Sequence, residues 1–87
     1  MSSARLVFSS DGVRPLSALA PGARGTVVEV LSTHTGRVDR LVALGVTPGA
    51  SIALLQAFPA IVFLCDQTEL AVERRVADAI LVRPSEG

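Results

Sequence analysis

The chain has 87 residues, 49% of them hydrophobic, and its eight acidic residues balance eight basic residues, all of which are Arg. A chain of this length forms one small domain with little room for a deep substrate cleft. The lack of a basic excess disfavours nucleic-acid binding, and the only basic pair, Arg74-Arg75, is interpreted as part of a solvated helix face. The single cysteine, Cys65, excludes an internal disulfide and predicts a cytoplasmic protein.

The apolar residues are mostly Ala, Val and Leu, and the mean hydropathy of +0.52 is high for a soluble monomer. We therefore expect either a dense aliphatic core or an exposed apolar contact surface, which a homo-oligomer would also cover. The longest apolar run, Ala57 to Cys65, is interrupted by Pro59 and is too short to cross a bilayer. The start of the chain lacks the apolar stretch of a signal peptide. These features predict a soluble, unprocessed protein without direct membrane insertion.

Three features are expected in the first third of the chain. Residues 1–14 are interpreted as a partly ordered N-terminal arm. Leu16 to Leu19 has two Leu three positions apart and predicts a single turn that closes one end of the core. Thr26 to Leu31 is rich in β-branched residues and predicts a strand.

The middle of the chain predicts a helix, a glycine stop and a turn. Apolar residues recur with helical spacing from Val38 to Gly45, which indicates a short helix lying on a sheet, with Thr35 as its N-cap. Gly45 stands where a left-handed C-terminal residue is needed. Pro48 can preset the first central φ of the next turn, and Gly49 can take a positive φ at the second. Gly45, Pro48 and Gly49 are therefore predicted to be structural turn residues.

The second half predicts a meander of short strands, one more short helix and a closing strand. The expected ranges are strands at Ile52–Ala57, Ala60–Cys65 and Glu69–Val72, a helix within Glu73–Ile80, and a strand at Leu81–Arg83. Many short strands with few free edges indicate a protein that is mainly β with two short helices, folded as a small SH3-like, partly closed barrel. The barrel domain is predicted over residues 15–84, between the arm and a tail at 85–87.

The order of these motifs resembles the FeoA family, the ferrous iron transport protein A domain, an SH3-like barrel that also occurs in iron-dependent repressors. The resemblance is carried by the Leu-x-x-Leu turn and following glycine, a glycine-led strand, and an Arg-Leu-x-x-Leu-Gly-apolar-x-Pro-Gly block, here Leu16, Leu19, Gly22, Gly25 and Arg40 to Gly49. Two departures from the family pattern concern loop contacts. The loop between the middle strands is shortened to Phe58-Pro59-Ala60, and Glu73 stands where the family often has Arg.

The resemblance implies a small cytosolic accessory protein that works with FeoB, a membrane ferrous-iron transporter with a cytosolic GTP-binding domain. It implies regulation or assembly of that transporter through the barrel surface, and no catalysis. The alternative is a stand-alone metal-sensing or regulatory SH3-like domain that binds a divalent transition metal or a peptide segment.

Five residues are candidates for contact with a partner protein. Leu44 and Val46 flank the Gly45 stop, whereas Phe58, Pro59 and Ile61 surround the shortened loop. Residues of these types are more often packed in a core. Core packing and contact with a partner are therefore both kept as interpretations for each of the five.

The sequence offers little for metal or enzyme chemistry. His34, Cys65 and Asp66 have ligand-type side chains, but their spacing matches no metal motif, so weak adventitious binding is favoured over a designed site and no cofactor is expected. No nucleophile stands beside His34 in an activating pattern, and no phosphate-binding glycine loop is present. The sequence therefore predicts a protein that is not an enzyme.

Overall fold

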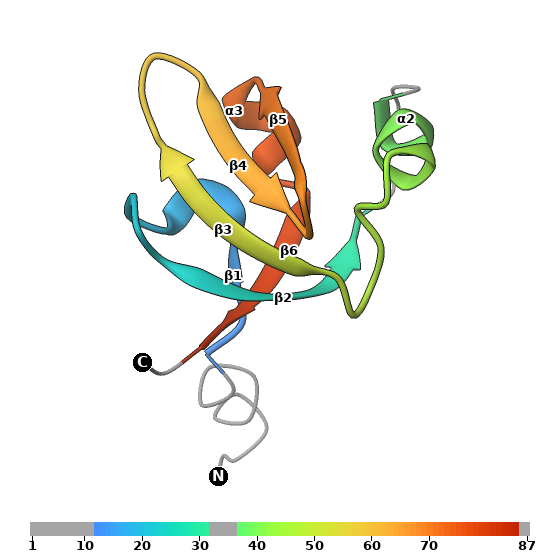
Figure 1. Cartoon of the computed structure of the whole chain (residues 1–87), viewed down its shortest axis with the longest axis horizontal. Coiled ribbons are helices and arrows are strands. Elements are labelled where there is room, and N and C mark those ends of the chain that lie inside the picture. The colour runs from blue at the N-terminus through green and yellow to red at the C-terminus, as the bar shows by residue number, and fades with distance from the viewer. Residues whose placement is uncertain (1–11, 32–36, 86–87) are drawn as a thin grey trace, which may run out of the picture.

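One antiparallel sheet of six strands is the framework of the molecule in the computed structural model, which describes residues 12–31 and 37–85 (Figure 1). Two short helices and a 3-10 turn join the strands. In chain order the elements are β1 (Arg14–Pro15), η1 (Leu16–Ala18), β2 (Arg24–Val30), α2 (Arg37–Ala43), β3 (Ser51–Gln56), β4 (Ile61–Cys65), β5 (Thr68–Val72), α3 (Arg74–Ala77) and β6 (Ile80–Pro84).

The strands lie in the order β1-β6-β2-β3-β4-β5, so the last strand of the chain pairs with both β1 and β2. Val82 of β6 lies opposite Arg14 on one side and Val27 on the other. From β2 to β5 each strand pairs with the next, which is the expected meander. The sheet is strongly curved but not closed, because β1 and β5 remain its edges. The predicted mainly-β fold with two short helices is confirmed.

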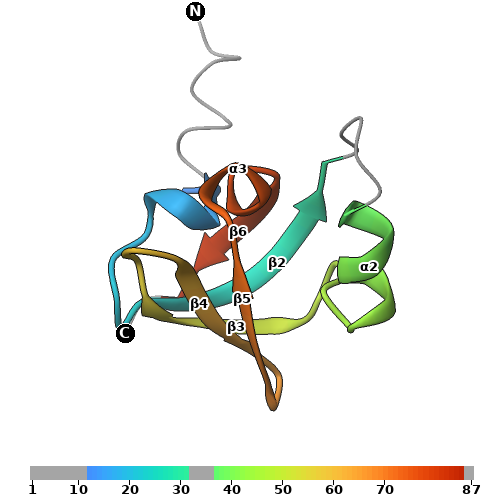
Figure 2. The ribbon, with the colours of Figure 1, turned by 90° about the horizontal axis from the view of Figure 1, so that it is seen from above.

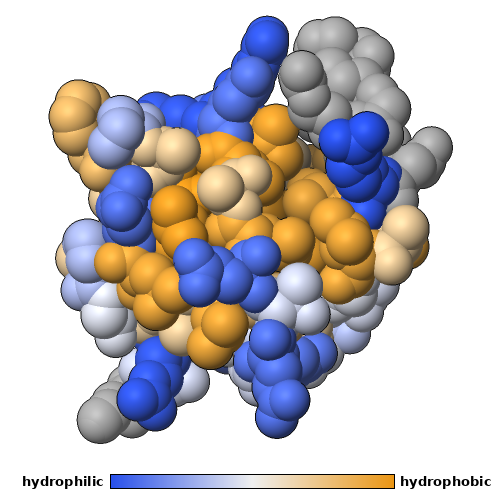
Figure 3. Space-filling model, turned by 45° about the horizontal axis from the view of Figure 1, so that its top comes forward, coloured by the Kyte–Doolittle hydropathy of each residue, from blue (hydrophilic) through white to orange (hydrophobic). Residues whose placement is uncertain are grey.

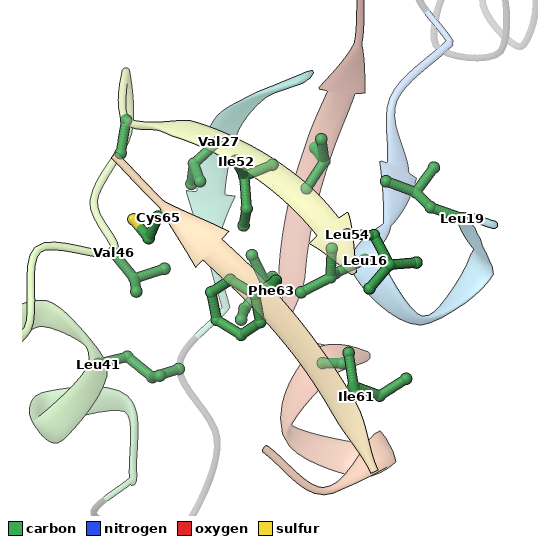
Figure 4. Packing of buried hydrophobic residues seen from close by; sticks show 14 residues of the cluster. Leu16, Leu19, Val27, Leu41, Val46, Ile52, Leu54, Ile61, Phe63 and Cys65 are labelled. Atoms are coloured by element: carbon green, nitrogen blue, oxygen red, sulfur yellow. The ribbon is translucent and has the colours of Figure 1, made fainter. Parts of the chain in front are cut away.

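The core follows from the alternation of side chains along the strands. In β4 every second residue is buried, and Phe63, which is fully enclosed, lies opposite Leu54 of β3 and Leu70 of β5. Figure 4 shows Phe63 in the middle of the cluster, with Leu16 from η1 at one side, next to Leu54. The expected turn at Leu16 to Leu19 thus contributes two buried Leu to the core.

Strands β2 and β6 approach each other closely at Gly25. A Cβ atom at this position would lie 2.5 Å from the Arg83 carbonyl oxygen and 2.7 Å from Cγ1 of Val82. These distances are too short for non-bonded atoms, so a glycine is required there by packing and not by its φ angle.

Helix α2 lies beside the start of β3 and away from α3, as Figure 2 shows from above. Its Leu41 is buried in the core, whereas Val42 is half exposed. The helix ends in a turn in which Gly45 has a φ of 96°, and the Val46 amide donates to the Leu41 carbonyl at 2.9 Å. Gly49 in the following turn has a φ of 95°. The predicted N-cap Thr35 lies outside the described residues.

Several element boundaries differ from those expected. The helix expected within Glu73–Ile80 is limited to α3, because Ile80 already pairs with Val30 in β6. Of the predicted arm, residues 1–11 lie outside the described residues, and Arg14 belongs to β1. Within 12–31 and 37–85, no helix combines the length and apolar character needed to span a membrane.

Candidate functional site

The loop between β3 and β4 presents an aromatic side chain to solvent. Phe58 is 81% exposed, and Pro59 beside it is also exposed. An exposed Phe is unusual, because burying an aromatic side chain removes a large apolar area from water. This loop is therefore a candidate contact surface, as the sequence predicts for these two residues.

Helix α3 fastens this loop to the rest of the molecule. The Arg74 guanidinium donates one hydrogen bond to the Ala57 carbonyl at 3.1 Å and a longer one to the Ser17 carbonyl at 3.4 Å. The Ser17 hydroxyl in turn donates to the Asp78 carboxylate at the end of α3. Through these contacts α3 links the residue before Phe58 to η1. The interpretation of Arg74 as part of a solvated face did not anticipate this link.

The other three candidates lie elsewhere. Val46 and Ile61 are 0% and 1% exposed and belong to the core, so they have no surface to offer a partner. Leu44 is 43% exposed in the turn that follows α2. The positive φ of Gly45 reverses the chain between Leu44 and Val46, which places the two side chains in opposite environments.

Leu44 and Phe58 lie at opposite ends of β3 and do not form one continuous site. The Gly45 carbonyl next to Leu44 accepts from the Cys65 thiol, and Cys65 pairs with Ile52 near the start of β3. Phe58 follows the other end of that strand. Figure 3 shows apolar side chains gathered over the middle of one face and interrupted by hydrophilic ones. Among the described residues, the exposed large apolar ones are Leu31, Val42, Leu44, Leu55 and Phe58.

Two of the three residues considered as metal ligands, Cys65 and Asp66, lie in the part of the chain that the structure describes. Cys65 is buried, and this burial raises the pKa of its thiol. The nearby Asp66 carboxylate is a second, smaller cause that raises this pKa further. Asp66 is exposed, and its Oδ1 accepts from the Ser51 amide at 3.2 Å. His34 lies outside the described residues. Within residues 12–31 and 37–85, no three His, Cys, Asp or Glu side chains are grouped to hold a metal ion. The metal-sensing alternative stays a prediction.

Comparison with known proteins identifies similar sequences and folds. The FeoA domain family matches the chain over residues 14–84. A solved structure described as iron uptake regulatory protein FeoA is 36% identical, with a TM-score of 0.73, covering 84% of this chain and 99% of its own. FeoA from Chlorobium tepidum is 32% identical, with a TM-score of 0.74, covering 84% and 71%. No curated protein matches the chain.

A more distant likeness describes the fold. Stenotrophomonas maltophilia FeoA, solved in complex with zinc and described as a prokaryotic SH3 domain protein, is 20% identical. Its TM-score is 0.71, and the match covers 77% of this chain and 86% of that one. The curved, unclosed sheet described above is therefore SH3-like.

Proposed function

Because the chain belongs to the FeoA family, we propose that it is a non-catalytic accessory protein of ferrous iron transport that acts in the cytoplasm by binding a FeoB-type membrane transporter. The S. maltophilia protein has been put forward as a bacterial ferrous iron transport activating factor. By extension, binding of this chain regulates or assembles the transporter. Any GTP hydrolysis belongs to the transporter, and nucleic acid is not a partner.

The exposure of Phe58 is the observation that supports transporter binding at a particular surface, the loop between β3 and β4. Aromatic side chains are enriched among the residues that dominate binding energy, particularly where they are presented by a well-ordered segment. The hydrogen bond from Arg74 to the Ala57 carbonyl holds the residue just before Phe58. A loop ordered before binding loses less conformational entropy when the complex forms. We therefore assign the first contact to Phe58 and Pro59.

Calorimetric titration of the chain against the purified FeoB-type transporter from the same cell, with and without GTP, tests the proposal. The informative variant is Phe58→Asp, because it replaces an exposed apolar contact without disturbing the core. Leu44→Asp is the matched comparison, since Leu44 is also an exposed apolar residue but lies at the other end of β3. Ile61→Asp is unsuitable because it would place a carboxylate in the core.

We expect saturable binding that Phe58→Asp abolishes and Leu44→Asp leaves unchanged. Loss of binding in Leu44→Asp alone would move the contact to the α2 end and overturn the assignment to the Phe58 loop. Absence of binding in every nucleotide state would overturn the transporter proposal itself.

A further inference from the structure

The two edges of the sheet differ in how well they are protected against pairing with another strand. β1 is two residues long and contains Arg14 and Pro15, the kinds of residue that block an edge. β5 is five residues long, contains no Pro and one charged residue, Glu69, and pairs with β4 without a register shift. A regular edge of this length offers backbone donors and acceptors to an incoming strand.

A hollow of about 210 Å³ lies next to this edge, between α2 on one side and β5 with α3 on the other. The hollow is large enough for an aliphatic side chain, its lining is partly polar and partly apolar, and its two charged residues come from opposite walls. The lining consists of Arg40, Leu41, Ala71, Val72, Glu73 and Val76.

We propose that β5 is a docking edge that accepts an extended segment of a partner protein as an additional strand. An aliphatic side chain of that segment enters the hollow against Leu41 and Val76. An acidic residue of the segment pairs with Arg40, which is exposed on the α2 wall. This surface is separate from the Phe58 loop and does not depend on the transporter proposal.

A partner segment fits this edge better than a second copy of the chain does. If two copies paired through β5, each would have to fill the hollow of the other with a side chain of its own β5. The aliphatic residues of β5, Leu70 and Val72, are packed against the core of their own domain. The outward side chains near the middle of the strand are Glu69, which is charged, and Ala71, which already lines the hollow of its own domain.

Selection of a displayed random heptapeptide library on the immobilised chain tests the proposal. A synthetic peptide with the enriched sequence is then titrated into the isotope-labelled chain, and the backbone amides are followed by NMR. Ala71→Lys is the informative variant, because a lysine is a residue that proteins use to protect a sheet edge. Ala20→Lys is its matched control, since Ala20 is an exposed alanine in the loop before β2, outside the hollow.

We expect enriched peptides to combine an aliphatic residue with an acidic one and to shift the amides of residues 68–73. Ala71→Lys should weaken their binding by about tenfold or more, with Ala20→Lys unchanged. The proposal is overturned if no peptide is enriched, if enriched peptides shift other amides only, or if sedimentation shows a wild-type dimer that Ala71→Lys dissociates.

Discussion

Arg74 of α3 donates a hydrogen bond to the carbonyl oxygen of Ala57, 3.1 Å away in the loop that presents Phe58. Its neighbour Arg75 points to the Glu73 carboxylate at 3.4 Å, in an ion pair whose side chains are 71% and 59% exposed. Adjacent arginines on one short helix thus differ in role. The first connects elements that are distant in sequence, and the second makes a local surface pair of the kind that contributes little to stability.

We expect Arg74→Gln to loosen the β3–β4 loop and to lower the free energy of unfolding by about 0.5 to 1 kcal/mol, because the shortened side chain loses its bonds to two carbonyl groups. Arg75→Gln is the matched control, and its effect should stay within about 0.5 kcal/mol. Urea unfolding measures the energies, and amide hydrogen exchange over residues 57–60 measures the loop. Equal exchange rates in both variants would contradict the assigned role of Arg74.

Gly25→Ala should destabilise the protein by about 2 kcal/mol or more, because the added Cβ would collide with the Arg83 carbonyl and the Val82 side chain across β2 and β6. Gly45→Ala is the comparison variant, in which the loss of stability comes from the backbone angle and not from a steric clash. Its Cβ meets nothing within 4 Å, but the φ of 96° is unfavourable for alanine, so a cost of about 1 kcal/mol is expected. Thermal unfolding of the two variants distinguishes them, and a larger loss at Gly45 than at Gly25 would refute the steric argument.

Two of the three Phe residues of the chain differ in exposure, since Phe63 is buried and Phe58 is exposed. Phe63→Ala should lower the free energy of unfolding by about 3 to 5 kcal/mol, because Phe63 is fully buried and its loss leaves a cavity. Phe58→Ala should change it by less than about 0.5 kcal/mol, since Phe58 is largely in solvent. Both values come from denaturant titration. A large loss for Phe58→Ala would show that the loop contributes to folding and is not only a contact surface.

Stability should fall as the pH rises above the ordinary thiol pKa, near 8.5, because of Cys65. Burial raises the pKa of this thiol in the folded protein, and Asp66 adds to the effect. Between the unfolded and folded pKa values the unfolded chain has lost the thiol proton and the folded chain retains it, so unfolding becomes more favourable. The chain has no Lys and no Tyr, so Cys65 is the only side chain that titrates in this range.

Urea titrations from pH 7 to pH 10 on the wild type and on Cys65→Ala measure this dependence. We expect a decline for the wild type and a nearly flat profile for the variant. The same burial should make the thiol react slowly with a disulfide reagent in the native protein and rapidly in urea. A wild-type profile as flat as that of Cys65→Ala would show that the thiol is not desolvated.

The strands and turns could be predicted from sequence where a local pattern determines them. The apolar run that ends at Cys65 and the glycines at 45 and 49 are signals of this kind, and the structure has a strand and two positive-φ turn residues there. By contrast, the two-residue strand β1 has no pattern of its own and exists because β6 pairs with it.

The candidate site could be predicted only in part, because exposure depends on contacts between distant segments. Leu44 and Val46 are alike in sequence, and only the path of the chain through Gly45 places one outside and the other inside. Arg74 looks like any surface arginine until the fold brings Ala57 to it. The hollow beside β5 has walls from α2, β5 and α3, so no single segment could reveal it.

The position of β6 between β1 and β2 also bears on how the chain folds. Pairing of Val82 with both Arg14 and Val27 joins the two ends of the domain, so neither neighbour can complete its ladder until β6 has been synthesised. Contacts of such long sequence separation slow folding, because the chain must lose the entropy of a long loop before they form. Until then β2 carries an open strand edge, and a nascent chain that stalls before residue 80 is in the state most prone to aggregation.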